Sequence, residues 1–162
     1  MPKLFLFIGA TGTGKTTLIQ SKLNLTPKRA KYIFDIQAQY KNYDNTNYGN
    51  FKNYISHIEN VHNSCIVVEE ATAFLGHYSV SEKFIEIILS KRHRNNLFFL
   101  CFHSLRSVPI KILDFTDYIF LKKTKENPTL IYNKFKDYPE IFTAFENVRN
   151  HTNKYHYIEI VL

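Results

Sequence analysis

Hydrophobic residues along this chain gather in short runs that are separated by polar segments. Five runs are almost wholly apolar, at 3–8, 32–34, 65–68, 97–102 and 118–121. Unbroken apolar runs of this length are typical of parallel strands that lie buried between helices. Stretches with helix signals separate them, so the pattern predicts an α/β fold with a mostly parallel central sheet.

The segments between these strands predict helices. We expect a helix after the first strand that ends near Pro27, because proline cannot continue it. An amphipathic helix is expected over 51–60, where apolar residues recur at helical spacing. Further helices are predicted from Ser81, as N-cap, and over about 138–148.

Two further strands and one long loop complete the expected architecture. The run 129–132 is predicted as an added strand, and 155–161 as the strand that closes the sheet. Residues 41–50 are rich in Asn and Tyr without apolar periodicity, which indicates a surface loop. Contact of this loop with a nucleic-acid strand through Tyr stacking is the alternative. The sequence contains no internal repeat or linker, so we expect one domain over 1–162.

Composition and charge narrow the class of protein. Hydrophobic residues make up 44% of the 162 residues, which is typical of a globular chain. The formal net charge of +7 favours a polyanionic partner, nucleic acid first, although lysines that only solubilise the surface would give the same balance. Cys65 and Cys101 each lie in a predicted strand, so we expect reduced core thiols rather than a disulfide. We expect no zinc site, no signal peptide and no membrane span, since the apolar runs are far shorter than the roughly 20 residues that a span needs.

The segment 9–16, Gly-Ala-Thr-Gly-Thr-Gly-Lys-Thr, links the first predicted strand to the first predicted helix. Its spacing fits the P-loop pattern G-x-x-x-x-G-K-[ST]. Glycines let the backbone turn tightly and aim its N–H groups at phosphate oxygens, and the helix N-terminus adds partial positive charge. Lys15 is expected to reach the β- and γ-phosphates, and Thr16 to offer its hydroxyl to Mg²⁺. The predicted nucleotide-binding residues are Gly9, Ala10, Thr11, Gly12, Thr13, Gly14, Lys15, Thr16 and Thr17.

Polar residues also follow the third and fourth predicted strands. Glu69 and Glu70 end the third strand, which is typical of the second half of a P-loop ATPase site. We expect Glu69 near Mg²⁺ and Glu70 as the general base for the attacking water. His103 ends the fourth strand and is predicted to sense the γ-phosphate by hydrogen bonding. Helix capping or a solvated position is the structural alternative for these residues.

Three other sets of polar residues each allow two interpretations. Asp35 and Gln39 follow the second strand. In one interpretation they lie near the nucleotide or at a subunit contact. In the other, Asp35 is a capping residue in an ordinary loop between a strand and a helix. Arg92 and Arg94 precede the fourth strand, and are candidates for a finger that acts on a neighbouring subunit, although cations at a helix C-terminus are also ordinary. The basic run 122–125 is a solvated surface or a nucleic-acid contact.

Taken in order, these motifs resemble the FtsK-HerA superfamily of P-loop ATPases, and within it the small genome-packaging ATPases of viruses and phages. The similarity is carried by GATGTGKT at 9–16, IFDIQAQY at 33–40, IVVEEA at 66–71 and SKRHRNNLFFLCFHS at 90–104. Two positions depart from the family pattern. Glu69 stands where Asp is usual, and His103 stands where Gln is usual.

The resemblance implies a three-layer, RecA/ASCE-like P-loop NTPase fold and an ATPase that uses ATP and Mg²⁺. It implies a motor that translocates viral or phage double-stranded DNA into a capsid, as a homo-oligomeric ring (pentamer or hexamer) that contacts capsid vertex proteins. In this family an arginine before the fourth strand acts on a neighbouring subunit's nucleotide, and Arg92 occupies that position. The expected location is the host cytoplasm or the packaging vertex of the virion. The expected catalytic residues are Lys15, Glu70, Arg92 and His103, with Thr16 and Glu69 at the metal.

Three alternatives stay open from the sequence. A Zot-like filamentous-phage assembly ATPase is related in sequence, but proteins of that type usually carry a membrane segment. A nucleoside or nucleotide kinase shares the P-loop but needs arginine-rich lid and acceptor-binding segments. A nucleotide-binding assembly scaffold with little hydrolysis is the third. The sequence has no Asn-Lys-x-Asp motif, which specifies guanine, so ATP is expected over GTP.

Overall fold

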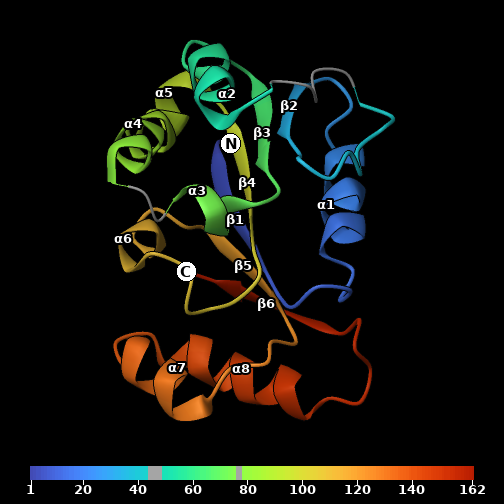
Figure 1. The fold of residues 1–162 in the computed structure, drawn as a ribbon, viewed down its shortest axis with the longest axis vertical. Helices are drawn as coiled ribbons and strands as arrows, with labels where there is room; N and C mark the ends of the chain where they lie inside the picture. Colours follow the sequence, from blue (N-terminus) through green and yellow to red (C-terminus); the bar gives the residue numbers. More distant parts are fainter. Residues whose placement is uncertain (44–48, 76–77) are drawn as a thin grey trace.

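The computed structural model describes residues 1–43, 49–75 and 78–162, in which the strands form a single mixed sheet (Figure 1). Within these residues the sheet has six strands in the order β2-β3-β4-β1-β5-β6. Among them β6 alone runs antiparallel, against β5. The strands are β1 Lys3–Ile8, β2 Ala30–Phe34, β3 Ser64–Val68, β4 Leu97–Phe102, β5 Tyr118–Lys122 and β6 Tyr157–Val161.

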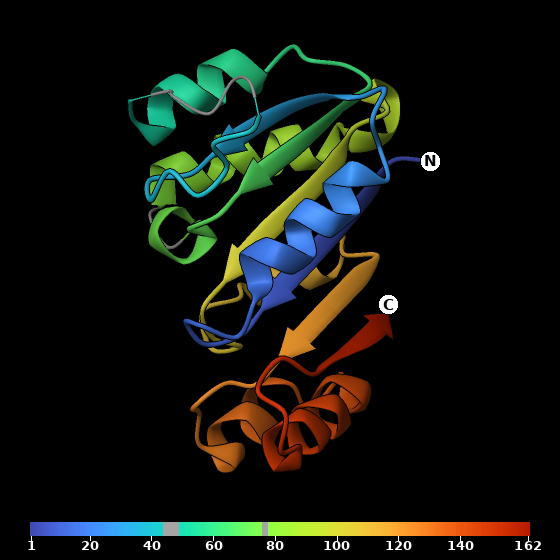
Figure 2. The ribbon, with the colours of Figure 1, turned by 90° about the vertical axis from the view of Figure 1, so that its right-hand side faces the viewer.

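Helices cover both faces of the sheet and make three layers. Figure 2 shows α1 lying across one face, and in the described chain it is the one helix that packs there. Helices α2, α4, α6, α7 and α8 contribute buried side chains to the core on the opposite face. The helices are α1 Lys15–Asn24, α2 Phe51–Ile58, α3 Ala71–Phe74, α4 Tyr78–Leu89, α5 Lys91–Arg94, α6 Ile110–Leu113, α7 Pro128–Lys134 and α8 Pro139–Asn150. This arrangement confirms the predicted three-layer α/β class.

The strand order decides which loops meet. β4 lies between β1 and β3, with Ile8 opposite Phe102 and Val68 opposite Leu100. The three strands are parallel, and their arrowheads in Figure 2 point to the same edge of the sheet. The loops that follow β1, β3 and β4 therefore gather at one edge, where ligands bind in open parallel sheets.

Aromatic packing makes the sheet a rigid base for these loops. Phe5 stacks on Phe99 with ring centroids 5.0 Å apart, and Phe7 stacks on Phe120 at 4.9 Å. Burial of each such side chain contributes roughly 1.5–3 kcal/mol, and stacked pairs add about 0.5–1.5 kcal/mol. The loops at the carboxyl edge are thus anchored on strands that the core holds firmly.

Two predictions of local structure are wrong. Residues 129–132 lie in α7 and not in an added strand, because Asn127 Oδ1 caps the helix by accepting from the backbone N–H of Thr129 at 2.9 Å, and Pro128 occupies the first turn. Ser81 is not an N-cap, since α4 begins at Tyr78. Residues 44–48 of the predicted 41–50 loop lie outside the described residues.

The basic run 122–125 is not a uniformly solvated segment. Lys122 is buried, and its Nζ donates to the carbonyl of Tyr155 at 2.8 Å. Lys123 is partly buried and donates to the carbonyl of His151 at 3.3 Å. Of the three lysines, only Lys125 is exposed. Both readings of the run are therefore wrong for Lys122.

The remaining expectations concern the cysteines and the membrane. Cys65 and Cys101 are free and buried on the sheet, as predicted, and burial raises the pKa of both thiols. In the described part of the chain, every helix is too short or too polar to cross a bilayer.

Candidate nucleotide-binding site

The loop 9–16 has the backbone geometry of a phosphate cradle. Gly12 and Gly14 have φ values of +79° and +80°, in the left-handed region that favours glycine, and Gly14 is the N-cap of α1. A Cβ at Gly9 would lie 2.7 Å from Lys122 Cβ and 2.9 Å from Thr13 Oγ1, so no larger residue fits. The loop can therefore bring its backbone N–H groups and the start of α1 to an anion.

A cavity of about 340 Å³ opens in front of this loop. It combines the loop with side chains that follow β2, β3 and β4, and with one residue from the connection before β6. Besides loop and α1 residues, its lining comprises Gln37, Gln39, Glu69, Glu70, His103 and Tyr155. The topology thus brings together Lys15, Thr16, Glu69, Glu70 and His103, five of the predicted site residues.

Lys15 lies at the centre of the cavity wall. Its side chain is buried, and Nζ donates to the carbonyl of Ala10 at 3.1 Å. Nζ also lies 3.5 Å from Nδ1 of His103. Neither partner is a carboxylate, so the ammonium charge is available for a phosphate oxygen, with which a charge-assisted hydrogen bond is stronger.

The metal end of the site is a cluster of oxygen atoms. Thr16 Oγ1 lies 2.5 Å from Glu69 Oε1 and 2.7 Å from the amide oxygen of Gln39. Hydroxyl, carboxylate and amide oxygens are the ligands that Mg²⁺ prefers, and Mg²⁺ is usually held by one or two protein groups together with substrate phosphates. No cluster of three or more His, Cys, Asp or Glu side chains suited to a metal occurs among the described residues. The donor set therefore fits Mg²⁺ that enters with a nucleotide.

Glu69 is buried, and burial raises the pKa of its carboxyl group. Hydrogen bonds from Thr16 and from the hydroxyl of Tyr40, which lies 2.8 Å from Glu69 Oε2, oppose that shift because they stabilise the charged form. Burial also raises the pKa of Tyr40, and the neighbouring Glu69 carboxylate adds to the shift. Tyr40 is therefore a neutral donor that fixes the orientation of Glu69.

Glu70 is held by both of its carboxylate oxygens. Oε2 lies 2.8 Å from Nε2 of His103, and Oε1 accepts from Nε2 of Gln37 at 3.1 Å. The other ring nitrogen of His103 faces Lys15. Lys15, His103, Glu70 and Gln37 thus form a continuous polar chain across the cavity, in which His103 connects the phosphate-binding lysine to the predicted base.

Asp35 and Gln39 have different roles: one caps the turn after β2 and the other lies in the site. The carboxylate of Asp35 accepts from the backbone N–H groups of Gln37, Gln39 and Tyr40, so it fixes the turn after β2. Gln39 points into the cavity, where its amide oxygen meets Thr16. The geometry therefore fits the interpretation of Asp35 as a capping residue and of Gln39 as a residue of the site.

Arg92 and Arg94 lie far from this cavity within one protomer. They belong to α5, which precedes β4 and therefore lies at the opposite edge of the sheet from the P-loop (Figure 1). Arg92 is exposed, whereas Arg94 is partly buried and its Nη1 has no hydrogen-bond partner among the described residues. The structure does not bring either arginine to the Lys15 of its own chain.

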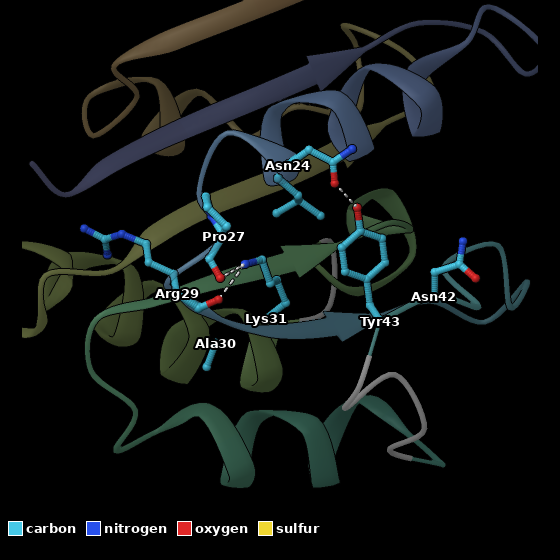
Figure 3. Close-up of a pocket in the computed structure, with 8 residues that line it drawn as sticks. Asn24, Pro27, Arg29, Ala30, Lys31, Asn42 and Tyr43 are labelled. Carbon is cyan, nitrogen blue, oxygen red and sulfur yellow. Dashed lines mark hydrogen bonds between the residues drawn. The ribbon is translucent and has the colours of Figure 1, made fainter.

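A second hollow, of about 420 Å³, lies beside the end of α1 and the start of β2 (Figure 3). Its cations have structural partners. Lys31 Nζ donates to the carbonyls of Thr26 and Arg29, each at 2.6 Å, and Tyr43 donates to Asn24 Oδ1 at 3.0 Å. Lys31 therefore holds the connection between α1 and β2 through its carbonyl groups, and this hollow is a weak candidate for an anion site.

Two residues that line the cavity, and one that contacts it through His103, were not predicted from the sequence. Gln37 follows β2, and its position after a parallel strand was a usable signal. Thr72, whose hydroxyl accepts from the backbone N–H of His103 at 3.3 Å, lies in the α3 turn after Glu70. Tyr155 reaches the cavity only because β6 pairs with β5, so no local pattern identifies it.

The sheet order and the glycine loop at the carboxyl end of β1 define a P-loop NTPase fold. No protein-family model matches the sequence, and no curated protein matches it. Solved structures do match, and they include genome-packaging NTPases of viruses. The crystal structure of B204, the DNA-packaging ATPase from Sulfolobus turreted icosahedral virus, aligns with a TM-score of 0.75 at 16% identity over 99% of this chain and 94% of that one.

Nucleotide complexes of a related protein match equally well. The genome-packaging NTPase B204 from Sulfolobus turreted icosahedral virus 2 in complex with ATP-γS aligns with a TM-score of 0.77 at 16% identity, over 99% of this chain and 92% of that chain. Its AMPPCP complex aligns with a TM-score of 0.75 at 16% identity, over 98% and 92%. At this identity the likeness establishes a shared fold over nearly the full length of both chains.

Proposed function

We propose that this protein is an ATP-hydrolysing motor that moves viral double-stranded DNA into a capsid. One observation carries the proposal. The P-loop, the Glu69–Glu70 pair and His103 converge on one cavity in a chain whose fold is that of viral genome-packaging NTPases.

The residues of the cavity suit hydrolysis of a nucleoside triphosphate. The P-loop backbone and Lys15 bind the phosphates, and Thr16 and Glu69, with Gln39 beside them, would hold Mg²⁺. When bound, Mg²⁺ supplies charge that stabilises the transferring phosphoryl group. Glu70 accepts a proton from the attacking water, whose oxygen bonds to the γ-phosphorus as the bond to the β-phosphate oxygen breaks, giving ADP and phosphate.

Glu70 must give up part of its present contacts to do this. Both of its oxygens are engaged, by His103 and by Gln37. We infer that a γ-phosphate attracts Lys15 and His103 toward itself, which frees one oxygen of Glu70 to orient water. His103 then senses the γ-phosphate in the place where the related ATPases usually have Gln.

Among the described residues no arginine lines the cavity of one protomer, which is consistent with a role for Arg92 in trans. Arg92 is exposed at the far edge of the sheet, where only another copy of the chain could bring it to a P-loop. A homo-oligomeric ring, of five or six copies, supplies that geometry. Hydrolysis would then depend on assembly, with a finger contributing roughly 10³–10⁵ in rate.

The formal net charge of +7 suits a partner as acidic as double-stranded DNA. Capsid vertex proteins are the remaining expected partners, and the host cytoplasm or the packaging vertex is the proposed location. Contact with DNA should be made mainly to phosphates, so binding should weaken steeply as salt rises.

An ATPase assay with and without double-stranded DNA, on protein sized by light scattering, tests the proposal. We expect Mg²⁺-dependent hydrolysis that DNA stimulates, and none for Lys15→Ala. Transfer of phosphate to added nucleoside monophosphates would instead identify a kinase. Tight ATP binding without turnover, in an assembled oligomer and with DNA, would identify an assembly scaffold.

A further inference from the structure

Tyr155 lines the same cavity as Glu69 and Glu70. It lies in the connection between α8 and β6, and its side chain is 55% exposed. A Cβ at Gly14 would lie 3.4 Å from Tyr155 Cδ1 and 3.9 Å from Cε1. The phenol ring thus lies beside Gly14, the N-cap of α1, at the distance where a side chain on that residue would contact it.

The order of the strands indicates which side of the cavity faces the γ-phosphate of a bound nucleotide and which side faces its base. Glu70 follows β3, the P-loop follows β1, and Tyr155 precedes β6 on the far side of β5. The γ-phosphate must lie toward Glu70, because that carboxylate has to reach the attacking water. The other end of a bound nucleotide therefore leaves the loop past Gly14, on the side where Tyr155 stands.

The backbone around Tyr155 is fixed independently of its ring. Its N–H donates to Asn153 Oδ1 at 2.9 Å, and its carbonyl accepts from the buried Lys122 Nζ at 2.8 Å. Lys122 in turn packs directly beneath Gly9 of the P-loop. The same lysine therefore ties the position of Tyr155 to the position of the phosphate cradle.

One contact competes for the ring. Lys154 Nζ lies 4.8 Å from the ring centroid of Tyr155. A cation–π contact at an exposed site is weaker than stacking of a nucleobase on an aromatic side chain, which is worth about 1–3 kcal/mol. A base can therefore displace Lys154 from the ring.

We propose that Tyr155 is the stacking platform for the base of the bound nucleotide. This inference rests on the proposed nucleotide-binding function and extends it to the nucleoside end of the ligand. Stacking tolerates any base because every base has a π-face, so Tyr155 supplies affinity more than base selectivity. The ring, and not the hydroxyl, does the binding.

Titration calorimetry with two ligands separates stacking from phosphate binding. ATP carries a base, whereas inorganic tripolyphosphate offers phosphates alone. We expect Tyr155→Ala to weaken ATP binding by about five- to 150-fold, which corresponds to the stacking range above, and to leave tripolyphosphate binding unchanged. Tyr155→Phe should bind ATP as the wild type does. Tyr132→Ala, which removes a tyrosine of similar exposure from α7, is the matched control.

A fluorescence variant gives a second, independent readout. The chain has no tryptophan, so Tyr155→Trp introduces a single indole. We expect ATP to change the emission of that indole and to retain its affinity, because tryptophan also stacks, and tripolyphosphate to leave the emission unchanged.

The outcomes distinguish this inference from the function on which it rests. Unchanged ATP affinity in Tyr155→Ala overturns the stacking role, and so does an equal loss for ATP and tripolyphosphate, which would mean that Tyr155 only shapes the P-loop. Failure of the wild type to bind either ligand overturns nucleotide binding itself.

Discussion

Thr16 and Glu69 are 53 positions apart in the sequence, yet Thr16 Oγ1 lies 2.5 Å from Glu69 Oε1. Thr16 lies in α1, which follows β1, and Glu69 follows β3. These two strands are not neighbours, since β4 separates them. The carboxyl edge of the sheet therefore assembles the metal end of the site across an intervening strand. Tyr40, through its bond to the other oxygen of Glu69, keeps the carboxylate turned toward Thr16.

Replacement of Glu69 by Gln should weaken nucleotide binding only when Mg²⁺ is present. Gln keeps the size of the side chain and an acceptor oxygen for Tyr40, but it removes the negative charge beside the metal. We expect ATP affinity to fall roughly tenfold or more with Mg²⁺ and to stay unchanged in EDTA. Calorimetry under both conditions measures this, with the exposed Glu140→Gln as the control. An equal loss with and without the metal would contradict the assignment.

Glu70→Gln should abolish turnover and spare binding. Gln keeps the size of the side chain and one oxygen that can accept from His103, so most of the geometry of the cavity is kept while the base is lost. We expect kcat to fall by about 10²–10⁴, the usual contribution of a general base, with ATP affinity unchanged. Steady-state phosphate release together with equilibrium ATP binding checks both parts. Hydrolysis at the wild-type rate would remove Glu70 from the mechanism.

Mixing two inactive variants tests whether Arg92 acts in trans. Lys15→Ala keeps Arg92 but cannot bind phosphate, whereas Arg92→Ala binds ATP but lacks the finger. We expect each alone to lose hydrolysis, by about 10³–10⁵ for Arg92→Ala, and the mixture to regain part of it wherever an intact site meets a neighbour's Arg92. The exposed Arg149→Ala should behave as the wild type. Two results would rule out the assignment: normal hydrolysis by Arg92→Ala, or a mixture as inactive as its parts.

Lys91, which precedes Arg92 in the sequence, should contribute to the stability of the fold and not to hydrolysis. Lys91 is buried, and its Nζ lies 2.5 Å from both Asp117 Oδ2 and the carbonyl of Phe115. Lys91→Met leaves that carboxylate and carbonyl without their cation, and we expect a loss of about 2–3 kcal/mol in the free energy of unfolding. Urea denaturation measures it.

Lys83 provides the matched comparison for Lys91. Its ion pair with Glu59 is at the surface, with the lysine side chain 45% exposed, so Lys83→Met should destabilise the fold much less than Lys91→Met. Equal costs for the two substitutions would mean that the buried ion pair of Lys91 stabilises the fold no more than a surface pair.

Much of the site could be predicted because its signals are local. The P-loop pattern fixes backbone conformation over eight consecutive residues, and Gly12 and Gly14 have the positive φ values that the pattern requires. The positions of Glu69 and His103 follow from a simple rule, that polar residues after buried parallel strands meet at one edge. Neither inference needs knowledge of distant contacts.

The failures have two causes: a local helix start that outweighs a short apolar run, and strand pairing that the sequence does not reveal. The run 129–132 is too short for periodicity to separate helix from strand, and the Asn127-Pro128 start signal decided the outcome. Lys122 looks solvated by composition, but its stem is buried under Gly9 and its Nζ under the segment before β6. Tyr155 reaches the site only because the antiparallel strand β6, which follows it, pairs with β5.

Displacement of a third strand from duplex DNA tests the claim that this protein moves along double-stranded DNA. A labelled oligonucleotide bound as a triplex on linear duplex DNA is released when a motor travels through it. We predict release that requires ATP, Mg²⁺ and assembled protein, that falls as salt rises, and that is absent for Lys15→Ala and Glu70→Gln. ATP hydrolysis by the assembled wild-type protein at low salt, with no release of the third strand, would contradict the claim.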